Sequence, residues 1–378
     1  MSYSPTTKER CPVVTVADVA QHIEQLAPLS YQEGYDNAGL QVGSASWGVS
    51  SVLVALDVTP EVVDEAVAHG ANMIVAHHPL IFSGLKHLTG ANHVQRAVMS
   101  AIKHDVAIYA AHTNLDSAPF GLSHAIAGRL GLERTQVLRP QHHGQLKLVT
   151  FVPPAHLEPV RAAMFGAGAG CIGTSYDCCS YGSDGRGTFR ATPGASPFVG
   201  RVGELHSEPE TRLEVLLPRH LQRSVVDALL QAHPYEEVAY DLIALENPNP
   251  TVGLGMVGDL PEPMESTEFL HQLKRTFGAP SLRHTPPLRP TLRRVAFCGG
   301  SGVDMLREAI AQRADAFVTS DIKYHQFFDA DGQLMLVDIG HHEIERCAID
   351  LLIEHISKKF TTFAVRKTEV DTNPVHYI

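Results

Sequence analysis

Long apolar runs are absent from this sequence of 378 residues, and no stretch approaches the roughly 20 residues that a membrane-spanning helix needs. The first residues, Met1–Arg10, are polar and have no apolar core segment, so we expect no signal peptide. Cysteine is scarce: 6 residues in no regular framework fit a reducing compartment better than a secreted disulfide scaffold. These absences together predict a cytoplasmic protein with no membrane partner.

An excess of positive charge is missing as well, since the net charge is −11 at pH 7. Contacts to nucleic-acid phosphates need clustered cations, so this balance argues against nucleic acid as a partner. Histidine, by contrast, is abundant, with 22 residues and several adjacent pairs, and imidazole is the commonest metal ligand. The length suggests two or three domains, and 44% hydrophobic residues allow each of them a sizeable core.

Short apolar runs alternate with amphipathic helical patterns in the first third of the chain and again in its last third. The expected strands are Ser51–Asp57, Met73–Ala76, Val106–Ala111, Arg294–Phe297, Ala316–Thr319 and Leu334–Ile339. The expected helices are Pro60–His69, Val94–His104, Gly121–Leu130, Asp304–Gln312 and the long His341–Phe360. This alternation predicts an α/β domain with a mostly parallel sheet covered by helices, whose function gathers at the carboxyl ends of the strands.

The pattern changes between these two regions, after a linker at Arg139–Gln145. Leu146–Val152 and Arg212–Leu217 are apolar strands that each end at a proline, and a helix that opens with His-Leu follows each of them. A duplicated β–α unit of this kind predicts a ferredoxin-like α+β insert, which we place at residues 145–246. Residues 1–144 and 247–378 are then the two halves of one metal-binding α/β domain.

Candidate metal ligands follow two expected strands in the first half. His77 and His78 come directly after Met73–Ala76, and because side chains alternate along a strand, their rings point apart and suit two neighbouring ions. Asp116 follows Val106–Ala111, where a carboxylate can face the same edge of the sheet. Taken alone, the histidines also fit a solvated loop pair, and Asp116 fits an ordinary turn or helix cap.

Two further candidates lie at the start of the long helix. His341 and Glu345 are four positions apart and share one helix face, whereas His342 is expected to face outward or to support the site from behind. An exposed pair within the helix would show the same spacing. The five donors together exceed the needs of one tetrahedral Zn²⁺, and a carboxylate can bridge two ions. We therefore predict two divalent ions per chain, of Zn, Fe, Mn, Co or Ni.

Five sequence blocks are similar to the signature blocks of a known family. They are Tyr35–Gly43 (YDNAGLQVG), Ala76–Pro79 (AHHP), His112–Asp116 (HTNLD), Thr319–His325 (TSDIKYH) and Gly340–Glu345 (GHHEIE). The ordered set resembles the Nif-three-like dinuclear-metal hexameric proteins, which are often named GTP cyclohydrolase I type 2 homologues. The resemblance implies a ring-shaped homohexamer and the ligands His77, His78, Asp116, His341 and Glu345, with Glu345 as the bridge. Ala232–Asp241 is similar to the PII/CutA-like insert of longer members.

The family resemblance also implies a function. It points to a dinuclear metal-dependent hydrolase that directs water at the purine ring of GTP, although no residue pattern shows a guanine pocket and another hydrolytic substrate stays open. The alternative is a non-enzymatic hexameric metal-binding or regulatory scaffold. The candidate catalytic residues are His325, as a proton carrier, and His112, as a residue that lines the pocket or orients a ligand. A structural role fits His325 equally well.

Other polar features have simpler explanations that compete with a role at the site. Asp36 and Asn37 can approach the site from an N-terminal loop, but they also suit a turn. The Gly-rich segment Phe297–Gly302 is a strand-to-helix turn of the kind that accepts an anion, which is a weak signal by itself. The adjacent His142 and His143 fit a solvated linker.

Overall fold

The computed structural model describes residues 13–142, 144–173 and 175–378. The expectations for Met1–Arg10 and His143 therefore fall outside the described residues. The chain divides into two compact units, one formed by Met1–Arg139 with Leu254–Ile378 and the other by Pro140–Gly253. The second unit contains all of the predicted insert. Across the described ranges, no helix combines the length and the apolar character that crossing a membrane requires.

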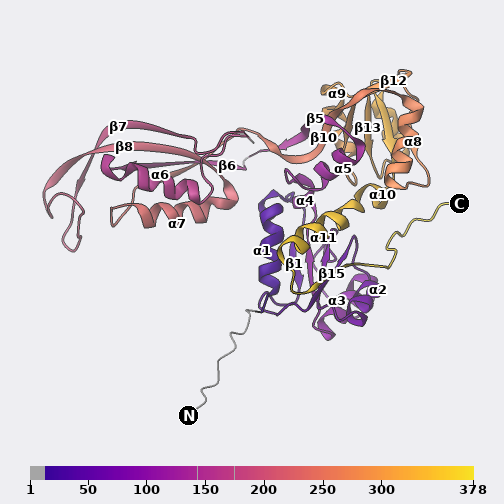
Figure 1. Ribbon diagram of the computed structural model, residues 1–378, viewed down its shortest axis with the longest axis horizontal. Coiled ribbons are helices and arrows are strands. Elements are labelled where there is room, and N and C mark those ends of the chain that lie inside the picture. The colour runs from indigo at the N-terminus through magenta and orange to yellow at the C-terminus, as the bar shows by residue number, and fades with distance from the viewer. Residues whose placement is uncertain (1–12, 143, 174) are drawn as a thin grey trace, which may run out of the picture. The chain divides into compact units, whose positions relative to one another are not determined.

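One sheet of the larger unit combines strands from the first third of the chain with its last strand (Figure 1). The strand order is β1 (Gly39–Val42), β4 (Ala107–Ala110), β3 (Met73–Ala76), β2 (Ser51–Ala55) and β15 (Ala364–Lys367). Only β1 is antiparallel to its neighbour. Every residue of β2, β3 and β4 is buried, as expected of parallel strands with helices on both faces.

Helices cover this sheet because their apolar residues recur at helical spacing. In α11 (Cys347–Lys359), the buried residues include Ala348, Leu352 and Ile356, which lie along one stripe. α11 contacts β2 and β15 and packs against α1 (Val16–Leu26) and α5 (Leu122–Leu130). α2 (Pro60–Ala68) and α3 (His93–Lys103) pack against each other and form a second layer with strands β2 to β4.

A second sheet completes the larger unit. Its order is β11 (Arg283–His284), β14 (Met335–Asp338), β13 (Ala316–Thr319), β12 (Thr291–Phe297), β10 (Asn249–Glu265) and β5 (Glu133–Gln141). The central strands β12, β13 and β14 are parallel. The predicted α/β class is confirmed, but the strands expected in one sheet form two. Alternating patterns locate strands, whereas long-range packing decides which strands pair.

The helix expected over His341–Phe360 is wrong as a single element. α10 (His341–Glu345) ends at Arg346, whose ψ of −15° departs from the usual α-helical value of about −42°, and α11 follows from Cys347. The amide of Ile349 bonds to the carbonyl of Arg346, so the break is a tightened turn rather than a loop. A continuous apolar pattern does not reveal this one-residue interruption between α10 and α11.

The smaller unit has the predicted ferredoxin-like fold. In chain order its elements are β6 (Gln145–Val152), α6 (Leu157–Gly166), β7 (Ser180–Arg190), β8 (Leu205–Pro218), α7 (Gln222–Ala232) and β9 (Tyr240–Ala244). The antiparallel sheet has the order β7–β8–β6–β9, which is the order of this fold. The helices α6 and α7 lie side by side (Figure 1) and share a core with β6 and β8.

The chain leaves and re-enters the larger unit through neighbouring strands. β5 and β10 are adjacent in the sheet, and a Cβ placed on Gly255 would lie 3.4 Å from the Cβ of Leu138. We expect a short Gly/Ser linker in place of residues 140–253 to leave a folded, metal-binding core, because the ends to be joined are close. Circular dichroism and metal analysis against the full chain would test this. An insoluble or metal-free product would show that the insert is integral to the fold.

Candidate metal centre

The predicted metal ligands follow the carboxyl ends of strands in both sheets of the larger unit. His77 and His78 directly follow β3, and Asp116 lies in α4 (Thr113–Ser117), just after β4. β3 and β4 are adjacent and parallel, so these residues share one edge of the first sheet. The short helix α10, which carries the other two predicted ligands, follows β14 of the second sheet. Residues far apart in sequence thus meet at strand ends.

Glu345 occupies the centre of the ligand cluster. Its Oε2 lies 2.9 Å from Nε2 of His78, 2.9 Å from Nε2 of His341 and 3.7 Å from Nε2 of His77. Oδ1 of Asp116 lies 3.6 Å from Nε2 of His77. Three groups result in which the donor atoms lie within 4.8 Å of one another, and the first joins His77, His78 and His112. The other two contain Glu345: His77 with Asp116 and Glu345, and His78 with His341 and Glu345. The structure thus brings all five predicted ligands together, and Glu345 belongs to two of the groups.

The far nitrogen of each imidazole ring is held by a hydrogen bond. Nδ1 of His77 lies 2.8 Å from the carbonyl oxygen of Ala111, and Nδ1 of His78 lies 2.8 Å from the carboxylate of Asp57. Nδ1 of His341 lies 2.7 Å from the carboxylate of Asp321, and Nδ1 of His112 lies 2.8 Å from that of Asp36. A carbonyl and ionised carboxylates can only accept, so Nδ1 carries the proton in every case. The lone pair of the neutral ring then lies on Nε2, which is the arrangement of metal-binding histidines.

The buried atoms of the cluster fit a cation. Nε2 of His77 and Oδ1 of Asp116 are both buried, and neither has a hydrogen-bond partner among the described residues. An unsatisfied buried polar atom costs about 1–3 kcal/mol, so two such atoms 3.6 Å apart need a shared ligand. Nitrogen and carboxylate oxygen donors without thiolate suit a divalent transition metal. The residues present therefore fit a metal centre.

The pKa values of the side chains in the cluster also indicate that it is stabilised by positive charge. Burial alone would lower the pKa of His78 and of His341, but hydrogen bonds to carboxylates outweigh it and raise these pKa values to about 9 and about 11. Burial, reinforced by Glu345, raises the pKa of Asp116 to about 8. Burial opposes ionisation of Glu345 too, yet hydrogen bonds from the histidines hold its pKa well below the usual range. Without metal, protons therefore supply the positive charge.

Metal binding should consequently release protons. At pH 7, the raised pKa values of His78 and His341 mean that both rings are protonated in metal-free protein, and a metal must displace those protons. The apparent affinity is expected to rise with pH from 7 to 9, by about tenfold per pH unit for each proton released. Titration calorimetry in buffers of different ionisation enthalpy measures the release directly. A binding heat independent of the buffer would contradict the expectation.

The Gly-rich turn Phe297–Gly302 closes against the cluster. A Cβ on Gly300 would lie 2.4 Å from Oε1 of Glu345 and 3.2 Å from Nε2 of His341. The backbone at Gly300 has a φ of +60°, which side chains other than glycine rarely adopt. Gly300 therefore makes room for Glu345 and His341. The helix that follows this turn, α9 (Leu306–Ala311), has only 6 residues.

A matched pair of substitutions separates the steric clash at Gly300 from backbone strain. Gly332 has nearly the same backbone, with a φ of +62°, but nothing lies within 4 Å of its Cβ position. Gly332→Ala should cost about 1 kcal/mol of stability through backbone strain alone. Gly300→Ala adds the clash with Glu345, so we expect a further loss of about 1–3 kcal/mol and weaker metal binding. Thermal unfolding and metal titration of both variants test this, and equal losses in the two would refute it.

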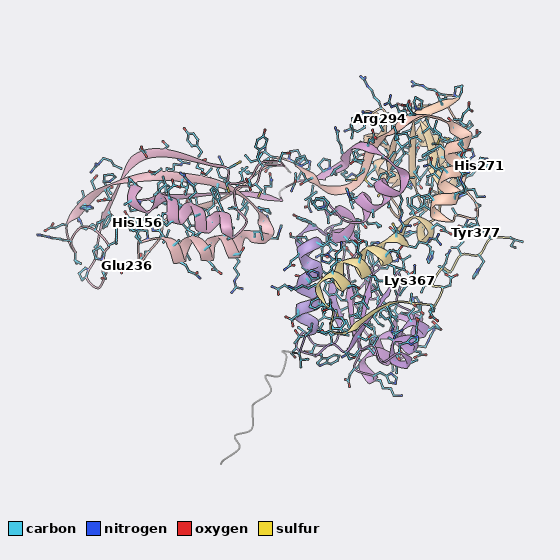
Figure 2. All side chains as sticks on the ribbon, in the orientation of Figure 1. His156, Glu236, His271, Arg294, Lys367 and Tyr377 are labelled. Atoms are coloured by element: carbon cyan, nitrogen blue, oxygen red, sulfur yellow. The ribbon has the colours of Figure 1, made fainter. Side chains whose placement is uncertain are left out.

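A cavity of about 700 Å³ lies beside the ligand cluster. Its wall includes the rings of His78, His112 and His341 together with Arg283. Tyr377, which Figure 2 labels on the C-terminal segment, also lines it. Ligand sites usually enclose roughly 300–1,000 Å³. A small molecule of nucleotide size therefore fits next to the metal ligands.

The two histidines that were candidates for catalysis differ in position: His112 lines the cavity and His325 does not. The ring of His112 lines the cavity, with its centroid 5.4 Å from His77 and 5.5 Å from His78. His325 is exposed, does not line the cavity, and packs edge-on against Tyr324. A catalytic role of His325 stays a prediction that no contact of the described residues supports. His342 lines the cavity, where sequence spacing placed it outside or behind the site.

Two carboxylates that orient ligands were not anticipated. Asp57 and Asp321, which hold the rings of His78 and His341, each lie two positions after a strand, β2 and β13. Their place at strand ends was the available signal. Asp36, expected near the site or in a turn, contacts His112 through its carboxylate.

Comparisons with known proteins identify the family and the fold. A family model described as Duf34/NIF3 (NGG1p interacting factor 3) matches residues 14–374. A Bacillus subtilis protein named GTP cyclohydrolase 1 type 2 homolog is 38% identical over 370 residues, which covers 95% of this chain and 98% of the relative. The crystal structure of a Bacillus cereus protein related to NIF3 has a TM-score of 0.85 at 38% identity and covers 97% of this chain and 100% of that one. The crystal structure of Staphylococcus aureus protein SA1388 has a TM-score of 0.76 at 28% identity, and the match covers 98% of this chain and 100% of that one.

Proposed function

This chain belongs to the Duf34/NIF3 family, and from this premise we propose that it is a hydrolase that uses two divalent metal ions. The observation that carries the proposal is the convergence of Nε2 atoms from His77, His78 and His341 on the carboxylate of Glu345. One ion would be held by His77, Asp116 and Glu345, and the other by His78, His341 and Glu345. Three protein donors per ion leave positions open for water and substrate.

The residues around the ions have separate roles in this proposal. When bound, two divalent ions activate water for nucleophilic attack at neutral pH. Asp57 and Asp321 fix the rings of His78 and His341 through Nδ1, so that the donor atoms keep their direction. Glu345 is almost fully buried, which keeps water from competing for its carboxylate.

His112 is the proposed proton carrier. Burial would raise the pKa of Asp36, but hydrogen bonds from His112 and Thr113 outweigh it and lower that pKa to about 2, so Asp36 is ionised. The carboxylate of Asp36 accepts the Nδ1 proton of His112, which fixes the ring and leaves Nε2 to take up or give a proton. This ring lines the cavity beside the metal ligands, within reach of a bound substrate.

The proposed substrate is GTP, on the strength of the name that the Bacillus subtilis relative carries. The reaction would be attack of water on the purine ring, with ring opening and loss of formate. The cavity has the volume for a nucleotide. Metal-loaded protein should be assayed with GTP, then with other purine nucleotides and phosphoesters. If the fully loaded protein turns over none of these yet binds a ligand or partner tightly, the hydrolase proposal fails and a metal-binding scaffold remains.

We also propose that the chain forms a homohexamer. Several large apolar side chains of the larger unit are exposed, including Phe120 (65%), Tyr324 (72%) and Phe328 (67%). Exposed aromatic surface of this kind is typical of protein–protein contacts. Light scattering coupled to size-exclusion chromatography measures the mass in solution. A monomeric mass would refute the assembly without affecting the metal centre.

A further inference from the structure

The insert contains a cavity of its own. Its volume is about 440 Å³. Its walls come from residue 151 of β6, the strand β7, the segment 191–199, residue 210 of β8 and the segment 235–239. All lining residues belong to the smaller unit, so this cavity is separate from the one beside the metal ligands. The proposed hydrolase activity assigns no role to it.

Aromatic rings form part of the wall. Phe151, Phe189, Phe198 and Tyr235 all line the cavity, and the rings of Phe198 and Tyr235 are 6.1 Å apart. Phe198 is 50% exposed, although a ring of this size is normally buried. Apolar walls with a few fixed polar groups are typical of small-molecule sites.

The charged groups of the wall are mostly carboxylates. Tyr235 donates its hydroxyl proton to Oε1 of Glu210 at 2.8 Å, which fixes that carboxylate against the wall. The amide of Ser196 donates to both oxygens of Glu236, labelled in Figure 2, and so joins the two loops that enclose the cavity. Glu237 is the third carboxylate, and Arg190 is the one cation among the lining residues that the structure describes.

We propose that this cavity binds a small organic cation, such as an alkylammonium or guanidinium group. A cation gains from the electron-rich faces of Phe198 and Tyr235 and from the fixed charge of Glu210. An anion would instead meet three carboxylates and a single arginine. The site adds a ligand-binding function to the insert that is independent of the metal centre.

The test uses the full chain and defined probes. Choline and agmatine represent the two cation classes, 3,3-dimethylbutan-1-ol is the uncharged counterpart of choline in shape, and inorganic phosphate represents anions. Saturation-transfer NMR and titration calorimetry measure binding. We expect both cations to bind, and neither the alcohol nor phosphate to compete with them.

Two substitutions place the binding in this cavity. Phe198→Leu removes an aromatic face but keeps an apolar side chain, and Glu210→Gln removes the charge but can still accept from Tyr235. Each is expected to weaken cation binding by about 5- to 30-fold, because Phe198→Leu removes a cation–π contact and Glu210→Gln removes an opposite charge. Glu158→Gln is the control, because Glu158 pairs with Arg161 on α6 and does not line the cavity.

Several results would overturn the proposal. They are no binding of either cation at millimolar concentration, equal binding of the uncharged alcohol, tighter binding of phosphate, or unchanged affinity in both cavity variants. Circular dichroism shows whether the variants fold. Should Phe198→Leu unfold, Glu210→Gln decides alone, since it changes neither the size of the side chain nor its packing.

Discussion

Replacement of Glu345 by alanine is expected to leave the protein without either metal ion and without hydrolytic activity. Oε2 of this one residue lies 2.9 Å from donor atoms of both His78 and His341 and 3.7 Å from that of His77, so both proposed ions depend on it. Loss of a ligand should exceed the roughly 10–100-fold loss of affinity that follows removal of a residue that merely orients a ligand. Elemental analysis after dialysis without chelator measures the ions per chain.

The outcome discriminates between one shared ligand and two separate sites. Glu354→Ala is a suitable control, because Glu354 is exposed on the neighbouring helix and pairs with Lys358 at the surface. If Glu345→Ala keeps one ion at full occupancy, Glu345 does not serve both positions. If wild-type protein saturates with one ion, the dinuclear proposal is wrong, whatever the activity.

Replacement of His112 by glutamine is expected to slow turnover by about 10²–10⁴-fold while both metal ions stay bound. Glutamine keeps the approximate size of the ring and can bond to Asp36, but it cannot carry a proton. Turnover and metal content must be measured on the same preparation. The pH profile of the residual activity should lose the limb that reports His112.

A comparison with His325 makes the result specific. His325 is exposed and outside the cavity, so His325→Gln in the same assay shows what loss of an imidazole causes without a place at the site. Loss of metal in His112→Gln would make His112 a ligand rather than a proton carrier, because one of its ring nitrogens lies within 4.8 Å of those of His77 and His78. A rate loss confined to His325→Gln would reverse the two assignments.

The sequence was sufficient to predict which five residues come together, because each of them lies at a recognisable strand end or helix start; that they bind metal stays a prediction. Histidine and carboxylate residues directly follow apolar strands, and the carboxyl ends of parallel strands share an edge. Asp57, at the end of an expected strand, and Asp321, within the block Thr319–His325, were assigned no role because a single aspartate near a strand end resembles any turn residue. Their role depends on which imidazole ring each carboxylate contacts. Packing decides this between residues that are 21 positions apart for Asp57 and His78, and 20 positions apart for Asp321 and His341.

In the fold, too, short-range sequence patterns predict single helices and strands but not which strands pair. Strands and helices such as β3 and α2 follow from periodicity and capping, since Thr59 caps α2 and Pro60 occupies its first turn. The ferredoxin-like insert followed from its duplicated pattern. The division of the larger unit into two sheets could not be predicted from local patterns. Strand β15 pairs with β2 across more than 300 positions, as in the pair Ala364 and Ser51.

That pairing has a consequence for how the protein is made. On the ribosome, β2 and β3 emerge early, but the first sheet lacks its edge strand until Ala364–Lys367 has been translated. The donor groups that His77 and His78 form with Glu345 are likewise incomplete until Glu345 has been translated. Contacts of such long sequence separation form late in folding. If the chain binds metal ions as proposed, the donor groups that contain Glu345 are complete only after that residue has been translated, so the ions would be taken up late in synthesis or after it.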